Sequence, residues 1–288
     1  MPSAFDRSAT VIDFFADLES SVAAALREDL GSGDATASLI DPARRASATV
    51  VVREPAVLCG QRWFDEVFRQ IDPSVSVRWL SRDGDRLEAN ALVCELQGCA
   101  RSLVTGERTA LNFLQTLSGT ATITREHAAQ LQGTSTRLLD TRKTIPGLRR
   151  AQKYAVRCGG GYNHRAGLYD GVLVKENHIV AAGSVAAAID GLRRAGITLP
   201  VEVEVENLTE LEEAIAAGAD MLLLDNFTFE QLRQAVVLTA GRVRLEASGG
   251  FGFDDLPAIG ATGVDFVSVG SLTKHLRATD FSMRIDHA

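Results

Sequence analysis

Three carboxylates alternate with valines in segment 201–206, which reads Val-Glu-Val-Glu-Val-Glu. Side chains of a strand point to opposite faces in turn, so Glu202, Glu204 and Glu206 share one face. Buried carboxylates need cations, because an unpaired charge is costly to remove from water. Asp225 ends the next apolar run and, with Glu204, predicts a Mg²⁺ site, since carboxylates, water and substrate phosphate are its usual ligands. An edge strand with a solvated face is the alternative.

Glycines follow two further apolar runs. Ser248, Gly249 and Gly250 precede the start of a predicted helix, and Gly270 and Ser271 follow the next run. Glycine lets the backbone approach a ligand closely, and N–H groups at a helix start attract anions. Together the two sites predict a phosphate cradle. The sequence has no G-x-x-x-x-G-K-[ST] pattern, and no G-x-G-x-x-G pattern opens a helix after a strand, so the usual nucleotide-binding signatures are absent.

A local basic cluster lies within a chain that is acidic overall, with 30 Lys plus Arg against 37 Asp plus Glu. The net charge of −7 argues against nonspecific nucleic-acid binding and against a polybasic membrane binder. Part of the cluster is expected to be a solvated helix face: Arg149, Arg150, Lys153 and Arg157. The other members suit a pocket for a small polyanion, because Arg grips carboxylates bidentately and Lys acts as a point charge. These are Arg142, Lys143, His164, Arg165 and Lys175.

From residue 136 onward, short apolar runs alternate with helical stretches, which predicts parallel strands joined by right-handed crossovers. A closed eight-unit barrel needs about 250 residues, more than this half of the chain provides. We therefore expect an α/β fold with an incomplete barrel of six or seven strands; an open doubly wound sheet is the alternative. Ligands of such folds bind at the carboxyl ends of the strands. The runs are 137–139, 172–174, 201–205, 221–224, 243–247 and 266–269.

The first hundred residues mix helix and strand patterns in an order typical of an α+β unit. A helix is expected over 11–30, and a long helical stretch over 100–132, with a break at Gly119. We predict an N-terminal α/β sandwich domain over 1–117, joined by the tail 276–288. The incomplete barrel with the active site is placed at 118–275.

Several classes of protein are disfavoured. There is no run of 18 apolar residues, so no transmembrane helix is expected. Residues 1–6 lack the basic region and apolar core of a signal peptide. The four cysteines form no C-x-x-C pair, which is typical of reduced thiols in a cytoplasmic protein.

Long motifs extend over nearly the whole chain after the first dozen residues. They are 106–112, 140–144, 155–165, 168–170, 175–178, 224–226, 246–250 and 268–270. In these motifs the chain resembles the quinolinate phosphoribosyltransferase family, also called carboxylating nicotinate-nucleotide pyrophosphorylases. Thr120 and Ile145 are small departures from the family pattern.

The resemblance implies the fold expected above and a reaction. Phosphoribosyl would pass from 5-phosphoribosyl-1-pyrophosphate to quinolinate, giving nicotinate mononucleotide, pyrophosphate and CO₂ in NAD biosynthesis. It also implies Mg²⁺, with Mn²⁺ as a substitute, and at least a homodimer. Arg108 would enter the active site of the neighbouring subunit.

The same resemblance implies roles for individual residues. Lys175, Glu204 and Asp225 would be catalytic, with Lys175 between the two substrates. Glu204 and Asp225 would hold the ribose hydroxyls and the Mg²⁺-bound pyrophosphate. The 5′-phosphate would lie against Ser248, Gly249, Gly250, Gly270 and Ser271. Quinolinate would be bound by Arg108, Thr141, Arg142, Lys143, His164 and Arg165.

Other functions stay open at this level. A related enzyme could use another acceptor, such as nicotinate, although so many cations favour a dicarboxylate. A Schiff-base lyase would use Lys175 or Lys143 as its nucleophile. A noncatalytic metabolite-binding module is a third possibility. His275 would either contact phosphate or play a structural part.

Overall fold

The computed structural model describes residues 12–286. The start of the chain, where no signal peptide is expected, lies outside the described residues. The described chain forms two compact units. The antiparallel unit comprises 12–125, 144–160 and 272–286, and the parallel unit comprises 126–143 and 161–271.

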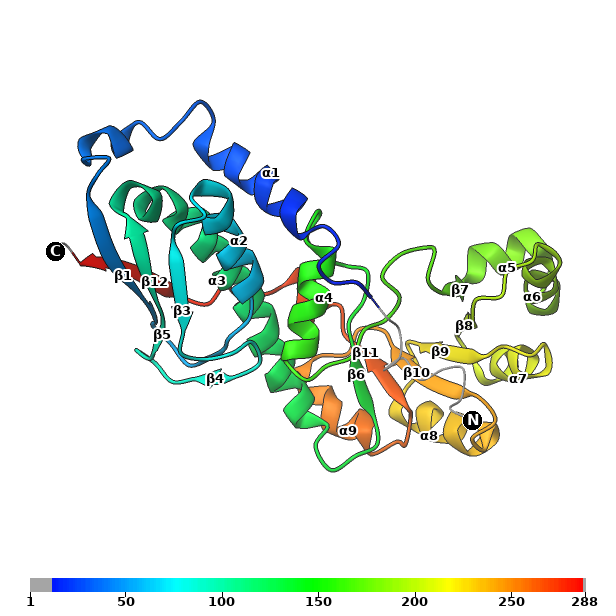
Figure 1. Ribbon diagram of the computed structural model, residues 1–288. Coiled ribbons are helices and arrows are strands. Elements are labelled where there is room, and N and C mark those ends of the chain that lie inside the picture. The colour runs from blue at the N-terminus through cyan, green and yellow to red at the C-terminus, as the bar shows by residue number, and fades with distance from the viewer. Residues whose placement is uncertain (1–11, 287–288) are drawn as a thin grey trace. The chain divides into compact units, whose positions relative to one another are not determined.

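The antiparallel unit contains a four-stranded sheet in the order β12-β1-β5-β3 (Figure 1). In β1, alternate residues Ala46, Ala48, Val50 and Val52 are buried, which is the pattern of a strand with one face on a core. Trp63, Phe64, Val67 and Phe68 of α2 pack into the same core. The elements are α1 (Leu18–Leu30), β1 (Arg45–Val52), β2 (Ala56–Val57), α2 (Gln61–Ile71), β3 (Ser76–Trp79), β4 (Arg86–Leu87), β5 (Leu92–Cys99), α3 (Ala100–Gln130), α4 (Arg149–Cys158) and β12 (Phe281–Asp286).

The long helix α3 runs without interruption from Ala100 to Gln130, so the expected break at Gly119 is wrong. Gly119 serves close packing instead. A Cβ atom at this position would lie 2.2 Å from the carbonyl oxygen of Arg277. The glycine therefore lets the C-terminal segment pass directly over the helix, at the modest cost of one glycine in a helix interior.

The basic helix α4 is less solvated than its sequence suggested. Arg157 is exposed, and Arg149 and Arg150 are half-buried, but Lys153 is fully buried. The expectation of a solvated face is wrong for Lys153, because α4 is covered around most of its circumference. Its buried residues include Ala151, Gln152, Ala155 and Val156.

The parallel unit is built on a six-stranded sheet in the order β6-β11-β10-β9-β8-β7. Each strand from β7 to β10 pairs with the next strand along the chain, and β6 pairs with β11. This winding in one direction, without reversal, excludes the doubly wound alternative. β6 and β7 remain unpaired with each other, which confirms an incomplete barrel with six strands. Leu139 of β6 instead forms a single bridge with Tyr162.

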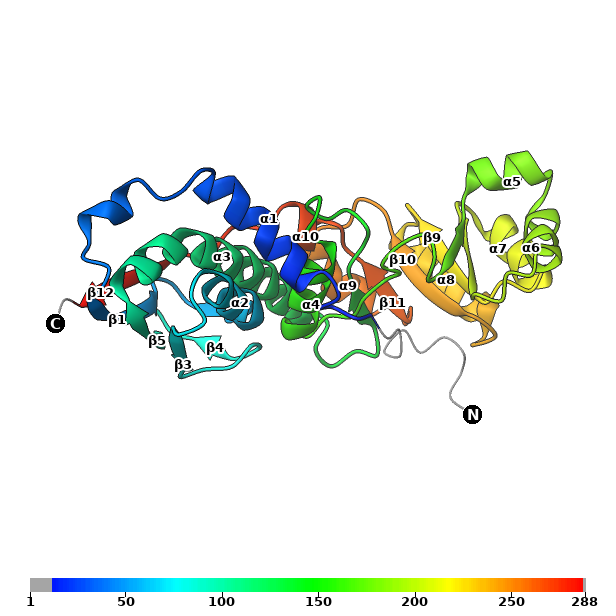
Figure 2. The ribbon, with the colours of Figure 1, turned by 45° about the horizontal axis from the view of Figure 1, so that its top comes forward.

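Helices alternate with these strands and lie along the sheet (Figure 2). The strands are β6 (Arg137–Leu139), β7 (Val172–Val174), β8 (Val201–Val205), β9 (Met221–Asp225), β10 (Arg244–Ser248) and β11 (Phe266–Ser268). The helices are α5 (Glu176–Ala182), α6 (Val185–Arg194), α7 (Leu208–Ala216), α8 (Phe229–Thr239), α9 (Leu256–Gly260) and the short α10 (Ser271–Lys274).

The strand register fixes which side chains share the inner face of the sheet. Glu204 lies opposite Leu223, and Leu223 lies opposite Glu246. Because residues in register point the same way, Glu202, Glu204 and Glu246 lie on one face. Leu139, Met221 and Phe266 form an apolar cluster there. The alternation of segment 201–206 therefore places Glu202 and Glu204 inward, as predicted, whereas Glu206 follows the end of β8 and is exposed.

Two further observations concern membrane-spanning helices and cysteines. Among residues 12–286, no helix combines the length and the apolar character that crossing a bilayer requires. The four cysteines are free thiols, of which Cys59 and Cys94 are buried.

Candidate active site

The predicted site residues of the parallel unit gather at the carboxyl ends of its strands. Thr141, Arg142 and Lys143 follow β6, and Lys175 follows β7. The others lie in the last two positions of the remaining strands or follow them: Glu204, Asp225, Ser248, Gly249, Gly250, Gly270 and Ser271. Since all six strands are parallel, these groups share one edge of the sheet. Arg108 belongs to the antiparallel unit, where it is exposed on α3.

The ends of β6 and β11 meet closely at Gly270. A Cβ atom on Gly270 would lie 3.0 Å from Cδ of Lys143 and 3.5 Å from Oγ1 of Thr141. The backbone N–H of Lys143 donates to the same Thr141 hydroxyl, at 3.1 Å. Gly270 thus leaves room for the lysine side chain beside the glycine turn.

The ends of β9 and β10 meet at Gly249. Its φ of +132° is a conformation that favours glycine, and a Cβ atom there would lie 2.7 Å from Oδ1 of Asn226. The N–H of Asn226 donates to the carbonyl of Ser248 at 3.0 Å. Gly250 beside it has open space around its Cα. The Ser248–Gly250 turn therefore presents bare backbone, which is what a phosphate cradle requires.

Lys175 and Glu204 form an ion pair between Nζ and Oε2. Lys175 is half exposed, whereas the side chain of Glu204 is only 17% exposed. The pair joins the ends of β7 and β8 and holds the glutamate where it faces the strand-end site. A largely buried carboxylate is thereby given the cation that its burial demands.

Glu204 and Asp225 provide hard oxygen donors on neighbouring strands, in a set that fits Mg²⁺. Lys175 engages Oε2 of Glu204, and Oδ2 of Asp225 accepts from its neighbour Asn226 at 2.8 Å. In the part of the chain that the structure describes, Oε1 of Glu204 and Oδ1 of Asp225 accept no hydrogen bond. Each carboxylate thus keeps one oxygen available to a cation.

His164 lies deeper, against two carboxylates from the sheet interior. Its Nε2 atom is 3.1 Å from Oε2 of Glu202 and 3.6 Å from Oε2 of Glu246. Its backbone N–H donates to Oδ1 of Asp140 at 2.8 Å, and Asn163 donates to Oδ2 of the same aspartate at 2.7 Å. Asp140 thereby fixes the loop that carries His164.

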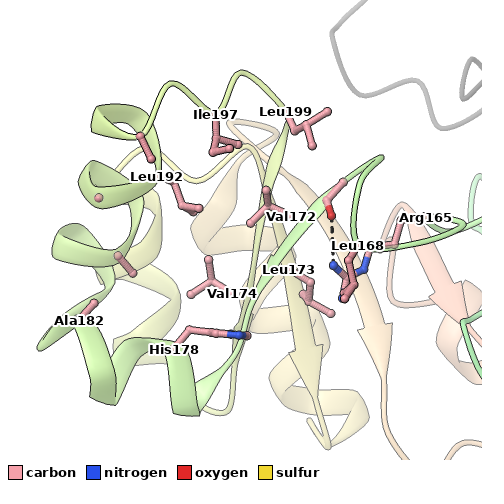
Figure 3. A pocket seen from close by; sticks show the side chains of 14 residues that line it. Arg165, Leu168, Val172, Leu173, Val174, His178, Ala182, Leu192, Ile197 and Leu199 are labelled. Carbon is pink, nitrogen blue, oxygen red and sulfur yellow. Dashed lines mark hydrogen bonds between the residues drawn. The ribbon is translucent and has the colours of Figure 1, made fainter.

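Arg165 lies beside an apolar cavity (Figure 3). Its Nη1 atom donates to the carbonyl of Gly171 at 3.1 Å. The cavity has a volume of about 510 Å³ and extends along the edge strand β7 toward His178 and α6. It lies outside the cluster of strand-end polar groups, because its walls are mainly the valines, leucines and alanines of β7, α5 and α6.

Sequence reasoning gave no role to Asp140, Glu246 or Gly171. Asp140 opens the run Asp-Thr-Arg-Lys, and Glu246 lies two residues before Ser248. A carboxylate two positions before a strand-end residue points to the same face, so the period of a strand was an available signal for Glu246. The contact of Gly171 with Arg165 had no such signal, because it depends on the path of the loop.

Comparison with known proteins shows which family this chain resembles. The protein-family model of the quinolinate phosphoribosyl transferase N-terminal domain matches residues 34–118, and the family model of the C-terminal domain matches residues 120–284. The probable nicotinate-nucleotide pyrophosphorylase, carboxylating, of Bacillus subtilis is 43% identical over 259 residues, 90% of each chain. The nicotinate-nucleotide pyrophosphorylase of Francisella tularensis has 48% identity and a TM-score of 0.91, covering 93% of this chain and 96% of that one. The chain therefore belongs to the quinolinate phosphoribosyltransferase family.

Proposed function

We propose that the protein transfers phosphoribosyl from 5-phosphoribosyl-1-pyrophosphate to quinolinate, with release of pyrophosphate and CO₂. The product is nicotinate mononucleotide, so the reaction belongs to NAD biosynthesis. The observation that carries the proposal is the gathering of cations, carboxylates and bare glycine backbone at one edge of a parallel sheet. Family membership and the names of the relatives support the same reaction.

Quinolinate carries two carboxylates, and the strand-end cations suit them. Arg142 and Lys143 follow β6 and Lys175 follows β7, which are the two edge strands of the open sheet. Arg165 lies on the loop before β7. Arginine binds a carboxylate through two parallel N–H groups, which fixes orientation as well as position. We assign these residues, together with Thr141 and His164, to the quinolinate site, which orients the ring nitrogen for attack.

The glycine turns after β10 and β11 suit the 5′-phosphate of the ribose. Ser248, Gly249 and Gly250 offer a hydroxyl and the backbone of two exposed glycines, and the half-buried Gly270 and Ser271 offer a backbone and a hydroxyl from the next strand. Oriented N–H groups attract a phosphate without requiring a charged side chain. These turns would fix the ribose carbon opposite the quinolinate nitrogen.

Departure of pyrophosphate leaves positive charge on the ribose carbon. Glu204 and Asp225 are the carboxylates that would oppose this charge and hold Mg²⁺, or Mn²⁺ in its place. The metal, when bound, stabilises the departing pyrophosphate. Lys175 restrains Glu204 through its ion pair and also lies at the quinolinate side. The 2-carboxylate leaves as CO₂ after the ring nitrogen has become cationic, because the adjacent positive charge stabilises the electron pair left on ring carbon 2, which then takes up a proton.

We further infer at least a homodimer, in which Arg108 completes the site of the neighbouring subunit. Its exposure on α3 is compatible with this role. Two inactive variants, Arg108→Ala and Lys175→Ala, would then restore part of the activity when mixed, because one site of each hybrid dimer is intact. Failure to restore activity after proven subunit exchange would refute the shared site.

The experiment that tests the reaction uses purified protein with Mg²⁺, 5-phosphoribosyl-1-pyrophosphate and either quinolinate or nicotinate. We expect mononucleotide only with quinolinate, with one CO₂ released for each nucleotide. Product from nicotinate alone would retain the phosphate site and refute the dicarboxylate pocket. Borohydride trapping in the same assay tests the lyase alternative, which predicts added mass at Lys175 or Lys143.

A further inference from the structure

Asn226 follows the last residue of β9 in a conformation that few side chains adopt. Its φ angle of +56° lies in the left-handed region, which glycine and asparagine tolerate best. This conformation ends the strand and lets the backbone N–H of Asn226 donate to the carbonyl of Ser248 on β10, at 3.0 Å. Asp225 and Ser248 are the last pair in the register of the two strands. The backbone of Asn226 thus fixes Asp225 beside the start of the glycine turn.

The side chain of Asn226 lies between the same two groups. Its Nδ2 atom donates to Oδ2 of Asp225 at 2.8 Å. A Cβ atom on Gly249 would lie 2.7 Å from Oδ1 of Asn226, so the amide occupies the space that a larger residue at position 249 would need. The nitrogen end of the amide therefore faces the carboxylate, and the oxygen end faces the glycine turn.

The hydrogen bond from Asn226 determines which oxygen of Asp225 is left for a cation. Residues 223 and 225 point to the same face of β9, and Leu223 lies opposite Glu204 on β8. Asp225 and Glu204 therefore face the same side of the sheet near its carboxyl edge. Because Asn226 engages Oδ2, the plane of the Asp225 carboxylate is restrained and Oδ1 stays available to a metal ion shared with Glu204.

We propose that Asn226 is a positioning residue that couples the metal carboxylate Asp225 to the phosphate turn Ser248–Gly250. Its amide orients Asp225 for Mg²⁺, and its backbone keeps that carboxylate in register with the turn that receives the 5′-phosphate. The two charged ends of 5-phosphoribosyl-1-pyrophosphate then meet groups that one residue holds together. This inference rests on the proposed assignment of Asp225 and the glycine turn to that substrate.

Binding without turnover tests the role of the amide. 5-Phosphoribosyl-1-pyrophosphate with Mg²⁺ is titrated into the protein in a calorimeter, in the absence of quinolinate, so that no transfer takes place. Asn226→Gly removes the amide but retains the left-handed backbone, which glycine adopts readily. We expect the dissociation constant to rise about tenfold, as is usual when a hydrogen bond that orients a metal ligand is removed. Wild-type affinity in Asn226→Gly would overturn the proposal, because the backbone alone would then suffice.

Steady-state kinetics separate positioning from a general loss of structure. In Asn226→Gly, KM for 5-phosphoribosyl-1-pyrophosphate and the Mg²⁺ concentration for half-maximal rate should each rise about tenfold. KM for quinolinate should stay within about twofold of the wild type, because the amide contacts no group assigned to quinolinate. A merely structural role would lower the free energy of unfolding and leave all three constants unchanged. Equal rises in the two KM values would show general damage to the site and refute the positioning role.

A double variant tests whether Asn226 acts through Asp225. Asp225→Asn removes the anionic metal ligand, so the amide of Asn226 no longer has a carboxylate to orient. Adding Asn226→Gly to Asp225→Asn should then raise the Mg²⁺ requirement by less than about twofold, compared with about tenfold in the wild-type background. Effects that multiply independently would show that Asn226 does not act through the carboxylate.

Asn90 provides the matched control. It has a φ angle of +66° and is also exposed, but it lies in the antiparallel unit, in the turn before β5. Asn90→Gly should leave both KM values and the Mg²⁺ requirement as in the wild type. Should Asn226→Gly fail to fold, Asn226→Ala also lacks the amide and should show the same rises, and this chain already holds alanine at +48° in Ala240.

Failure of this inference is distinguishable from failure of the proposed site. If Asp225→Asn leaves the Mg²⁺ requirement unchanged, the assignment of Asp225 to the metal is wrong. If Asp225→Asn raises the requirement while Asn226→Gly does not, the assignment stands and the positioning role of Asn226 is refuted.

Discussion

Nζ of Lys175, at the end of β7, is paired with Oε2 of Glu204 on the neighbouring strand β8. The pair links the cationic side of the strand-end cluster to its carboxylate side. A lysine held by a carboxylate is an ammonium donor, whereas a Schiff-base nucleophile must be a neutral amine. The pair therefore favours an electrostatic role for Lys175 over the lyase alternative.

Replacing Lys175 by glutamine should lower kcat on the order of 10²-fold, because an electrostatic group aimed at the reacting centre is lost and Glu204 keeps an uncompensated charge. Steady-state rates at saturating substrates provide the measurement. Arg233→Gln is the control, since Arg233 pairs with Glu230 on the surface of α8 and should not affect turnover. An unchanged kcat in Lys175→Gln would remove the lysine from the reaction.

Arg142→Ala should act mainly on quinolinate. We expect its KM to rise about 10- to 100-fold, the usual value of a charge-assisted contact to a carboxylate. KM for 5-phosphoribosyl-1-pyrophosphate should change little. Initial rates over a range of each substrate give both constants. A KM for quinolinate equal to that of the wild type would contradict the assignment.

Removing divalent metal should abolish turnover, and adding Mg²⁺ or Mn²⁺ should restore it. Glu204→Gln and Asp225→Asn should each raise the Mg²⁺ concentration needed for half-maximal rate, because each removes one anionic oxygen donor. Activity is titrated against Mg²⁺ after treatment with EDTA. Full turnover in excess EDTA would exclude the metal from the reaction.

Gly119→Ala should destabilise the protein by about 1–3 kcal/mol, because the new methyl group would overlap the carbonyl of Arg277. Urea unfolding gives the free energy. Gly191→Ala is the matched control, since Gly191 also lies within a helix but has no atom within 4 Å of an added Cβ. That variant should be neutral or more stable by up to about 1 kcal/mol. Equal effects in the two variants would refute the packing role.

The buried carboxyl group of Asp83 should make the stability of the protein depend on pH. Burial raises the pKa of Asp83 to about 6, above the value of about 3.9 in an unfolded chain. Ionising Asp83 therefore costs more free energy in the folded chain than in the unfolded chain. The contribution of Asp83 to the free energy of unfolding is lost as pH rises from about 4 to about 6.

Asp83→Asn cannot ionise, so its free energy of unfolding relative to wild type should increase by up to about 2 kcal/mol between pH 4 and pH 7. Asparagine retains an oxygen for the Gly60 N–H, which donates to Oδ1 of Asp83 at 3.0 Å. Urea unfolding of both proteins across this range gives the difference. A difference that is constant with pH would show that the carboxyl has an ordinary pKa.

The sequence by itself determined the order of the elements and the face of each strand. Alternation along 201–206 placed Glu204 inward, and polar residues after each apolar run placed Lys143, Asp225 and Ser248 at one edge. These predictions succeeded because strand period and parallel connection are local properties of the chain. The family motifs are also local, because each is a contiguous stretch of the chain, and they therefore indicated the reaction class from the sequence alone.

Tertiary structure alone decided which distant residues meet. The pairing of β6 with β11, which leaves the barrel open beside β7, depends on how six strands close around one core. The continuity of α3 through Gly119 depends on the chain near Arg277, and the burial of Lys153 on the surroundings of α4. Glu202 and Glu246 meet His164 from two separate strands. None of these contacts leaves a mark on local spacing, because each joins segments that only packing brings together.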